Sequence, residues 1–131
     1  MWRRLALGLW SGWLVAQGAV FAPLAFAVLA ERTTAGRFAA AGFTTVAYGS
    51  LGFGLVCYLL RPRTVGRQGR ALLLALAPGA LLLASHVALS PLIAGHGPYF
   101  AAAHGAGTLI YGVATLLVLG MWWQDERRSL R

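Results

Sequence analysis

The chain consists of long apolar blocks separated by short basic segments. Three blocks contain no Asp, Glu, Lys or Arg, namely residues 5–30, 38–60 and 71–124. A helix needs about 20 apolar residues to cross the hydrocarbon of a bilayer, so the first two blocks each predict one span. The third block is too long for one span, and two Gly and a Pro interrupt it at 95–98. The sequence therefore predicts four helices, at about 5–30, 37–60, 71–94 and 99–123.

These four segments predict an all-α membrane protein. Alternation of apolar and polar residues with a period of two is absent, which disfavours a membrane β-barrel. Backbone groups in lipid must find partners within their own segment, which favours helices. Short connections make consecutive helices antiparallel neighbours. We predict a single domain over residues 1–131, folded as an up-down-up-down four-helix bundle with no second domain.

Charge supports a membrane protein and predicts its orientation. Only 11% of residues are charged, whereas a soluble domain carries about a quarter. Of the 11 arginines, nine lie on the side of the two termini and the 61–70 loop, and only Arg32 and Arg37 lie on the other side. The positive-inside rule then places both termini in the cytoplasm, and we expect a multi-pass protein of the bacterial inner membrane. Because the arginines cluster at helix ends and do not follow an aromatic face, we expect no nucleic-acid partner.

The first apolar block has an alternative interpretation as a signal peptide. Residues 1–4 resemble a basic n-region, and residues 25–27 resemble a cleavage site. The apolar stretch is, however, about twice as long as the usual 7–15-residue core of a signal peptide. We predict an uncleaved first span; cleavage would leave three helices.

Small residues predict close helix packing. Gly8 and Gly12 lie four apart in the first helix, and so do Ala103 and Gly107 in the fourth. Such pairs let backbones approach within one chain or between copies, so intrachain packing and a homo-oligomer face both remain open.

Polar residues within the spans are the candidates for function. From a rise of ~1.5 Å per residue, His86 and His104 lie ~12 and ~8 Å below the outer ends of their helices. A polar stripe on the fourth helix, spaced i, i+4, i+7 and i+11, should face the bundle interior; it consists of His104, Thr108, Tyr111 and Thr115. Gln17, near mid-membrane, is expected to form an interhelical hydrogen bond.

Three readings of the histidines remain open. In the first, His86 and His104 bind haem b, and Arg32 and Arg37 meet its propionates. In the second, the two histidines bind copper, with His96 as a third ligand. In the third, they are neutral side chains with hydrogen-bond partners in a polar seam.

No motif of an enzyme is present. The chain lacks a G-x-S-x-G, a paired carboxylate and a phosphate loop after a strand. Its three acids, Glu31, Asp125 and Glu126, lie outside the spans, which disfavours a proton-coupled carrier. The single cysteine, Cys57, excludes an internal disulfide. We therefore expect no enzymatic activity.

Three short segments resemble a known family: 21–26 in the first helix, 35–36 at the start of the second, and 100–105 in the fourth. They resemble the transmembrane-protein-205-like domain, a four-helix membrane family of unknown function. The chain differs from that family's pattern at Gly107 and Tyr111, where small polar residues are expected. The family is distantly similar to the copper resistance protein D group, whose membrane bundles carry histidines toward the outer side. The resemblance implies a four-helix membrane protein and keeps metal handling among the possible functions.

Two functions follow from the sequence. One is binding of haem or copper through a histidine layer near the extracytoplasmic side. The other is a structural or assembly subunit that packs against a larger membrane complex, with the histidines in a packing seam.

Overall fold

The computed structural model describes residues 1–61, 68–95 and 97–129. Four helical rods cross its length, and the described residues contain no strand. The first rod is α1 (Trp2–Ala16), continued by the π-helix η1 (Gln17–Phe21) and by α2 (Ala22–Val28); the others are α3 (Arg32–Leu59), α4 (Gln68–Ala94) and α5 (Phe100–Ser129). Each rod is long and apolar enough to cross a membrane. The all-α four-helix prediction is confirmed.

Two helix ends differ from the prediction by more than three residues. The second rod begins at Arg32 and not at 37, because Glu31 is extended and its carbonyl accepts the amide of Ala35. The fourth rod continues past 123 to Ser129, through Gln, Asp, Glu and Arg, most of which are good helix formers. Both errors have one cause: loss of hydrophobicity marks the edge of the hydrocarbon, whereas a helix ends only where its backbone leaves helical geometry.

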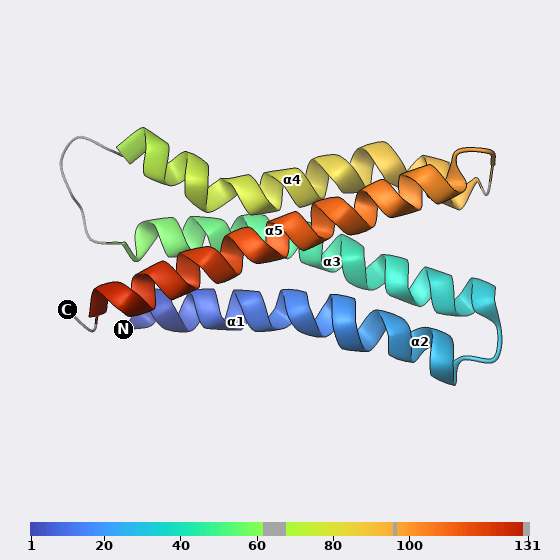
Figure 1. The fold of residues 1–131 in the computed structure, drawn as a ribbon, viewed down its shortest axis with the longest axis horizontal. Coiled ribbons are helices and arrows are strands. Elements are labelled where there is room, and N and C mark those ends of the chain that lie inside the picture. Colours follow the sequence, from blue (N-terminus) through green and yellow to red (C-terminus); the bar gives the residue numbers. More distant parts are fainter. Residues whose placement is uncertain (62–67, 96, 130–131) are drawn as a thin grey trace.

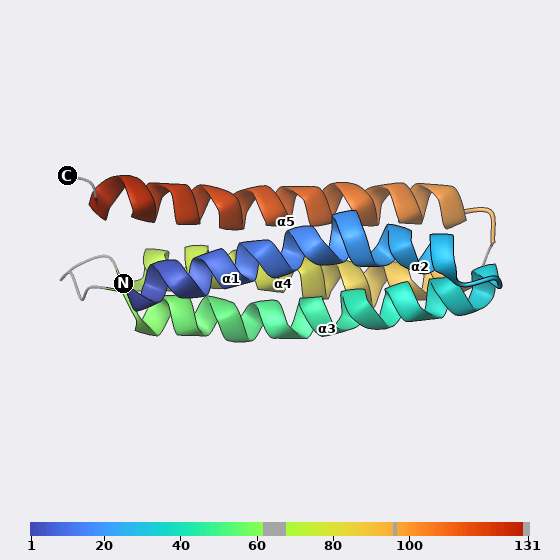
Figure 2. The ribbon, with the colours of Figure 1, turned by 90° about the horizontal axis from the view of Figure 1, so that it is seen from below.

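The rods are arranged in a ring (Figures 1 and 2). The order around the ring is α1, α3, α4 and α5, and α5 closes it by packing against α1. Among the described residues, the backbones of the diagonal pairs α1–α4 and α3–α5 do not approach each other closely. The start of α1 and the end of α5 lie at one end of the bundle, called here the terminal end. The 29–31 connection, the end of α4 and the start of α5 lie at the opposite end.

The bundle is closed along α1 and more open along α2. The helix α2 packs against α3 but makes no close contact with α5 within the described chain. Figure 1 shows α2 and α5 diverging toward the opposite end. As a result, α4 is the one helix of the described chain that lies beside the first turns of α5.

Bulky apolar side chains of α1 fill the centre of the bundle. Leu7, Trp10 and Leu14 are fully buried there. The indole N–H of Trp10 donates a hydrogen bond of 2.9 Å to Ser50 Oγ, and the Trp10 ring stacks on Phe53 at 6.2 Å. The polar atom of a large buried ring thus has a partner, as burial requires.

The contact of α3 with α4 depends on glycine. A Cβ atom on Gly79 would lie 2.7 Å from the amide nitrogen of Leu51, and one on Gly54 would overlap the carbonyl oxygen of Ala75. Both obstacles are backbone atoms, which cannot turn away. Small residues therefore bring these two helices together within one chain. This agrees with the predicted intrachain packing, which was one of the two roles expected of small residues. Gly12, by contrast, is exposed and has no atom near its Cβ position.

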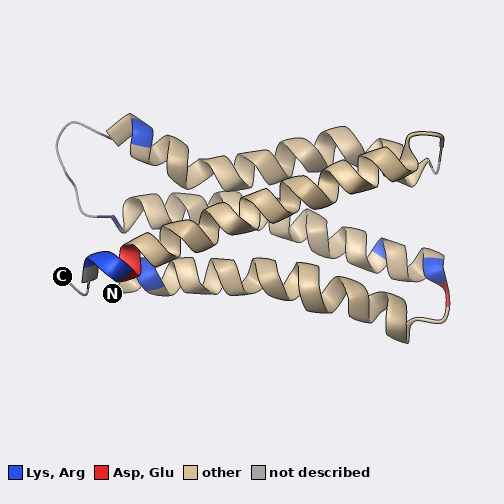
Figure 3. Cartoon of the chain, in the orientation of Figure 1, with Lys and Arg blue, Asp and Glu red and all other residues tan. Residues whose placement is uncertain are grey.

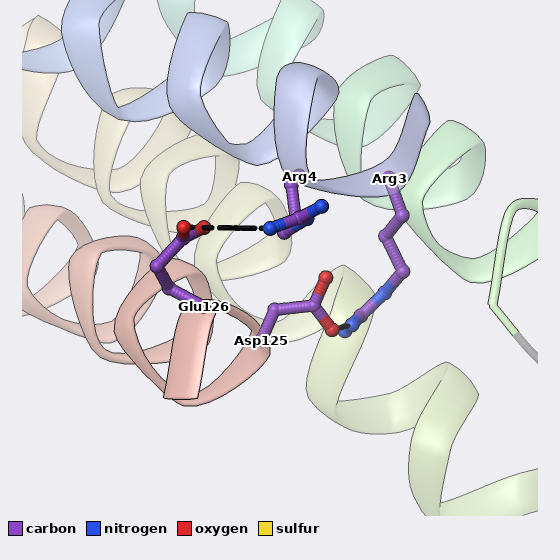
Figure 4. A network of polar contacts seen from close by, with 4 residues as sticks. All are labelled: Arg3, Arg4, Asp125 and Glu126. Atoms are coloured by element: carbon purple, nitrogen blue, oxygen red, sulfur yellow. Dashed lines mark hydrogen bonds and ion pairs between the residues drawn. The ribbon is translucent and has the colours of Figure 1, made fainter. Parts of the chain in front are cut away.

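The charged residues that the structure describes lie at the two ends of the bundle (Figure 3), most of them at the terminal end. There Arg3 pairs with Asp125, and Arg4 Nη1 lies 3.4 Å from Glu126 Oε1. Figure 4 shows both pairs bridging from α1 to the last turns of α5. They tie the first helix to the last and explain why α5 stays helical beyond its apolar part.

Candidate functional site

His86 is held between two hydroxyl groups at the contact of α3 with α4. Its Nε2 lies 3.2 Å from Thr44 Oγ1, and its Nδ1 lies 3.0 Å from Ser90 Oγ. Thr44 already donates its proton to the carbonyl of Ala40 at 2.8 Å. Thr44 Oγ1 must therefore accept from Nε2–H. Both ring nitrogens of His86 are thus engaged, one with Thr44 and the other with Ser90.

His104 lies apart from His86. Its side chain is exposed on α5, where its ring stacks on Phe100 at 5.8 Å with an interplanar angle of 10°. No contact joins it to His86, and its ring has no hydrogen-bond partner among the described residues. The two imidazoles share no partner within the described chain.

The polar stripe of α5 faces the interior only in part. The hydroxyl of Tyr111 donates to the carbonyl of Leu14 at 2.7 Å, and its ring meets Phe43 edge-on at 5.1 Å. His104 and Thr108 are exposed, so the prediction that the whole stripe faces inward is wrong for these two. The reason is the divergence of α2, which leaves no helix opposite the first turns of α5. Thr108 bonds to the carbonyl of His104 in its own helix and needs no interior partner.

The remaining predicted ligands do not complete a site. Arg32 and Arg37 are exposed on the first turns of α3. His96 lies outside the described residues. Within the described chain, no three His, Cys, Asp or Glu side chains gather where they could hold a metal ion. Both ring nitrogens of His86 are engaged in hydrogen bonds in this arrangement, so haem or copper ligation by the histidines stays a prediction.

Gln17 is the polar residue whose surroundings the sequence did not reveal. It is only 7% exposed, and the predicted interhelical hydrogen bond is absent, since no hydrogen bond joins its amide to another described residue. The amide rests on α3 at Gly42, where any Cβ atom would overlap it. Gln17 also begins the π-helix, in which its carbonyl accepts the amide of Ala22.

Pro23 is the sequence signal for this π-helix. Proline has no N–H, so the carbonyl of Ala19 cannot receive its usual i+4 bond, and the register shifts by one residue just before it. Such π-bulges are frequent at functional sites. Here the bulge borders a groove of about 300 Å³ between η1 and α3. The groove is lined by Gln17, Phe21, Phe38, Ala41, Gly42 and Thr45.

Residues 5–96 match a family described as Domain of unknown function (DUF4149). The chain belongs to this family. The DUF4149 match includes Gln17, Pro23 and His86 and ends before α5, so His104 lies outside it. The match agrees with the predicted membrane domain of unknown function, and no match supports a link to the transmembrane-protein-205-like or copper resistance protein D groups. No curated protein and no solved structure matches the chain.

Proposed function

We propose that this protein is a non-catalytic subunit of the bacterial inner membrane that binds another membrane protein through the exposed start of α5. The observation that supports the proposal is His104, an exposed imidazole without a hydrogen-bond partner in the described chain. The Arg bias of the sequence supports the orientation, with the terminal end toward the cytoplasm.

The position of His104 argues for a protein partner. Four residues separate it from Phe100 at the start of α5, about 6 Å of helix rise. An unpaired polar group facing lipid costs roughly 1–3 kcal/mol. A neighbouring transmembrane helix with a hydroxyl, amide or carboxyl group at the same depth would remove that cost and cover the flat surface of His104 stacked on Phe100.

The shape of the bundle leaves room for such a helix. Because α2 diverges from α5, the His104 side of α5 lies opposite no helix of the chain itself. Ala101 and Thr108, on the same face as His104, are also exposed and small enough to allow close approach.

Binding of haem or copper is the alternative, and the resemblance to histidine-bearing membrane bundles is its main support. His86 could become a ligand only by giving up its bond to Thr44 or to Ser90. His104 would in addition have to turn from the exposed face of α5. The geometry favours the assembly subunit.

Site-specific photo-crosslinking in native membranes tests the proposal. A photoreactive amino acid at Ala101, one turn from His104, should give an adduct of defined mass. The same residue at Leu92, exposed on α4 and, like Ala101, within two residues of the helix end, should give none. The substitution His104→Ala should weaken the Ala101 adduct. Equal labelling at the two positions would refute a specific partner surface.

The same preparation distinguishes the alternative. A Soret band, or stoichiometric copper, that disappears in His86→Ala and in His104→Ala would establish ligand binding and overturn the assembly role. A colourless, metal-free protein that gives the Ala101 adduct is the expected result.

A further inference from the structure

The unpartnered amide of Gln17 indicates that something is missing from the groove beside it. The side chain is more than nine-tenths buried and lines the groove. A glutamine amide offers two N–H donors and one acceptor, and no hydrogen bond joins this amide to another described residue. Its atoms are not fully enclosed, since Arg3 Nε is the one described side-chain atom that is both buried and unpartnered. The amide borders the groove, and inside a membrane an unpaired polar group is costly, so a partner is expected.

The depth of the groove restricts what that partner can be. Eleven residues separate Gln17 from Val28, about 16 Å of helix rise, and thirteen separate Arg32 from Thr45, about 20 Å. Both residues therefore lie near the middle of a ~30 Å hydrocarbon core. Neither water nor lipid head groups reach this level, so the partner must itself be embedded in the membrane.

The groove carries complementary hydrogen-bonding groups. The hydroxyl of Thr45 donates to the carbonyl of Ala41 at 2.9 Å, and its oxygen can still accept a bond. Gln17, at about the same depth, has free N–H groups. A two-fold axis along the membrane normal brings each residue to the same depth in its partner. Gln17 of one copy can then donate to Thr45 of the other, and the reverse bond follows by symmetry.

The shape of the groove suits a close contact between copies. Ala41 is small and exposed in the groove, which allows another helix to approach there. The open side of Gly42 is filled by the amide of Gln17. At the rim of the groove, Phe21 and Phe38 are 48% and 59% exposed. Each ring can enter the volume of about 300 Å³ in the other copy.

We infer that the groove between η1 and α3 is the interface between two copies of this chain in the membrane. This surface is formed by different helices from the surface around His104. A result at one of them therefore leaves the proposal for the other intact.

Cysteine cross-linking in vesicles tests this interface. The buried Cys57 is first replaced by Ala, and a single cysteine is placed at Ala41 in the groove. The matched control is Leu109→Cys, because Leu109 is 73% exposed on α5 and lies nine residues into its helix, as Ala41 does in α3. Oxidation should give a product of twice the chain mass at Ala41 and none at Leu109.

The hydrogen bonds are tested with two further variants, Gln17→Leu and Thr45→Val. Intramembrane hydrogen bonds contribute about threefold each to an equilibrium, so loss of the symmetric pair should weaken dimerisation about eightfold. The dimer fraction is measured by energy transfer between labelled chains. The chains are diluted in the membrane by raising the ratio of lipid to protein. Each bond needs both Gln17 and Thr45, so either single substitution removes both bonds of the pair. The double variant should therefore dimerise no more weakly than either single variant.

Three results would overturn the dimer. These are equal cross-linking at Ala41 and Leu109, no cross-linking at Ala41, or an Ala41 product with a mass other than twice the chain. Circular dichroism of each variant confirms that it is folded. If the Ala41 product is absent while the Ala101 adduct forms, the dimer is refuted and the assembly role stands.

Discussion

Gly79 provides the sharpest test of how the bundle is held together. The substitution Gly79→Ala adds one methyl group, which would lie 2.7 Å from the amide nitrogen of Leu51 and 2.8 Å from the carbonyl carbon of Ser50. These are backbone atoms of α3, so relief requires α3 and α4 to move apart. Overpacking of this kind costs about 1–3 kcal/mol.

The same substitution at an open position has the opposite sign. Gly112 is exposed in α5, and no atom lies within 4 Å of its Cβ position. Gly112→Ala keeps the gain in helix propensity, about 0.5–1 kcal/mol, without the clash. The gain in helix propensity is the same in Gly79→Ala and Gly112→Ala, so it cancels when the two are compared. Their unfolding free energies should therefore differ by the cost of the clash alone, about 1–3 kcal/mol.

Reversible unfolding in mixed micelles measures this difference, with the midpoint shift of each variant compared with the unsubstituted chain. Gly54→Ala, which would meet the carbonyl of Ala75, should behave like Gly79→Ala. If all three variants are stabilised equally, the close α3–α4 contact is refuted.

Other predictions concern the core, the ion pairs and the topology. Ser50→Ala leaves the buried indole N–H of Trp10 without its acceptor and should lower the unfolding free energy by about 1–3 kcal/mol; an unchanged midpoint would contradict the bond. Asp125→Arg should destabilise the chain by about 1 kcal/mol, and adding Arg3→Asp should restore most of the loss, because the pair lies at the surface end of the bundle. Tags at either terminus should be reached by reagents only from the cytoplasmic side, and labelling from the periplasm would reverse the proposed orientation.

The predictions for the histidines and Gln17 show where sequence reasoning stopped. The heptad-like spacing of the α5 stripe correctly put His104, Thr108 and Tyr111 on one side of the helix. It could not tell that this side is covered at Tyr111, by Leu14, and open at His104. That difference comes from the divergence of α2, which is a property of two helices far apart in the sequence. The π-helix at Gln17 had a local signal, Pro23, but the groove beside it needed α3 as its second wall.

The sequence by itself determined the four membrane spans, because span length and charge placement follow from the thickness of the bilayer and act on each segment alone. Only the tertiary structure decided which faces of the helices meet. In water an amphipathic helix shows its buried face by its pattern, but in lipid the inner and outer faces are both apolar, so the pattern gives little direction. The neighbours of His86, the exposure of His104 and the unpaired amide of Gln17 therefore depended on packing between helices, down to single glycines such as Gly42 and Gly79.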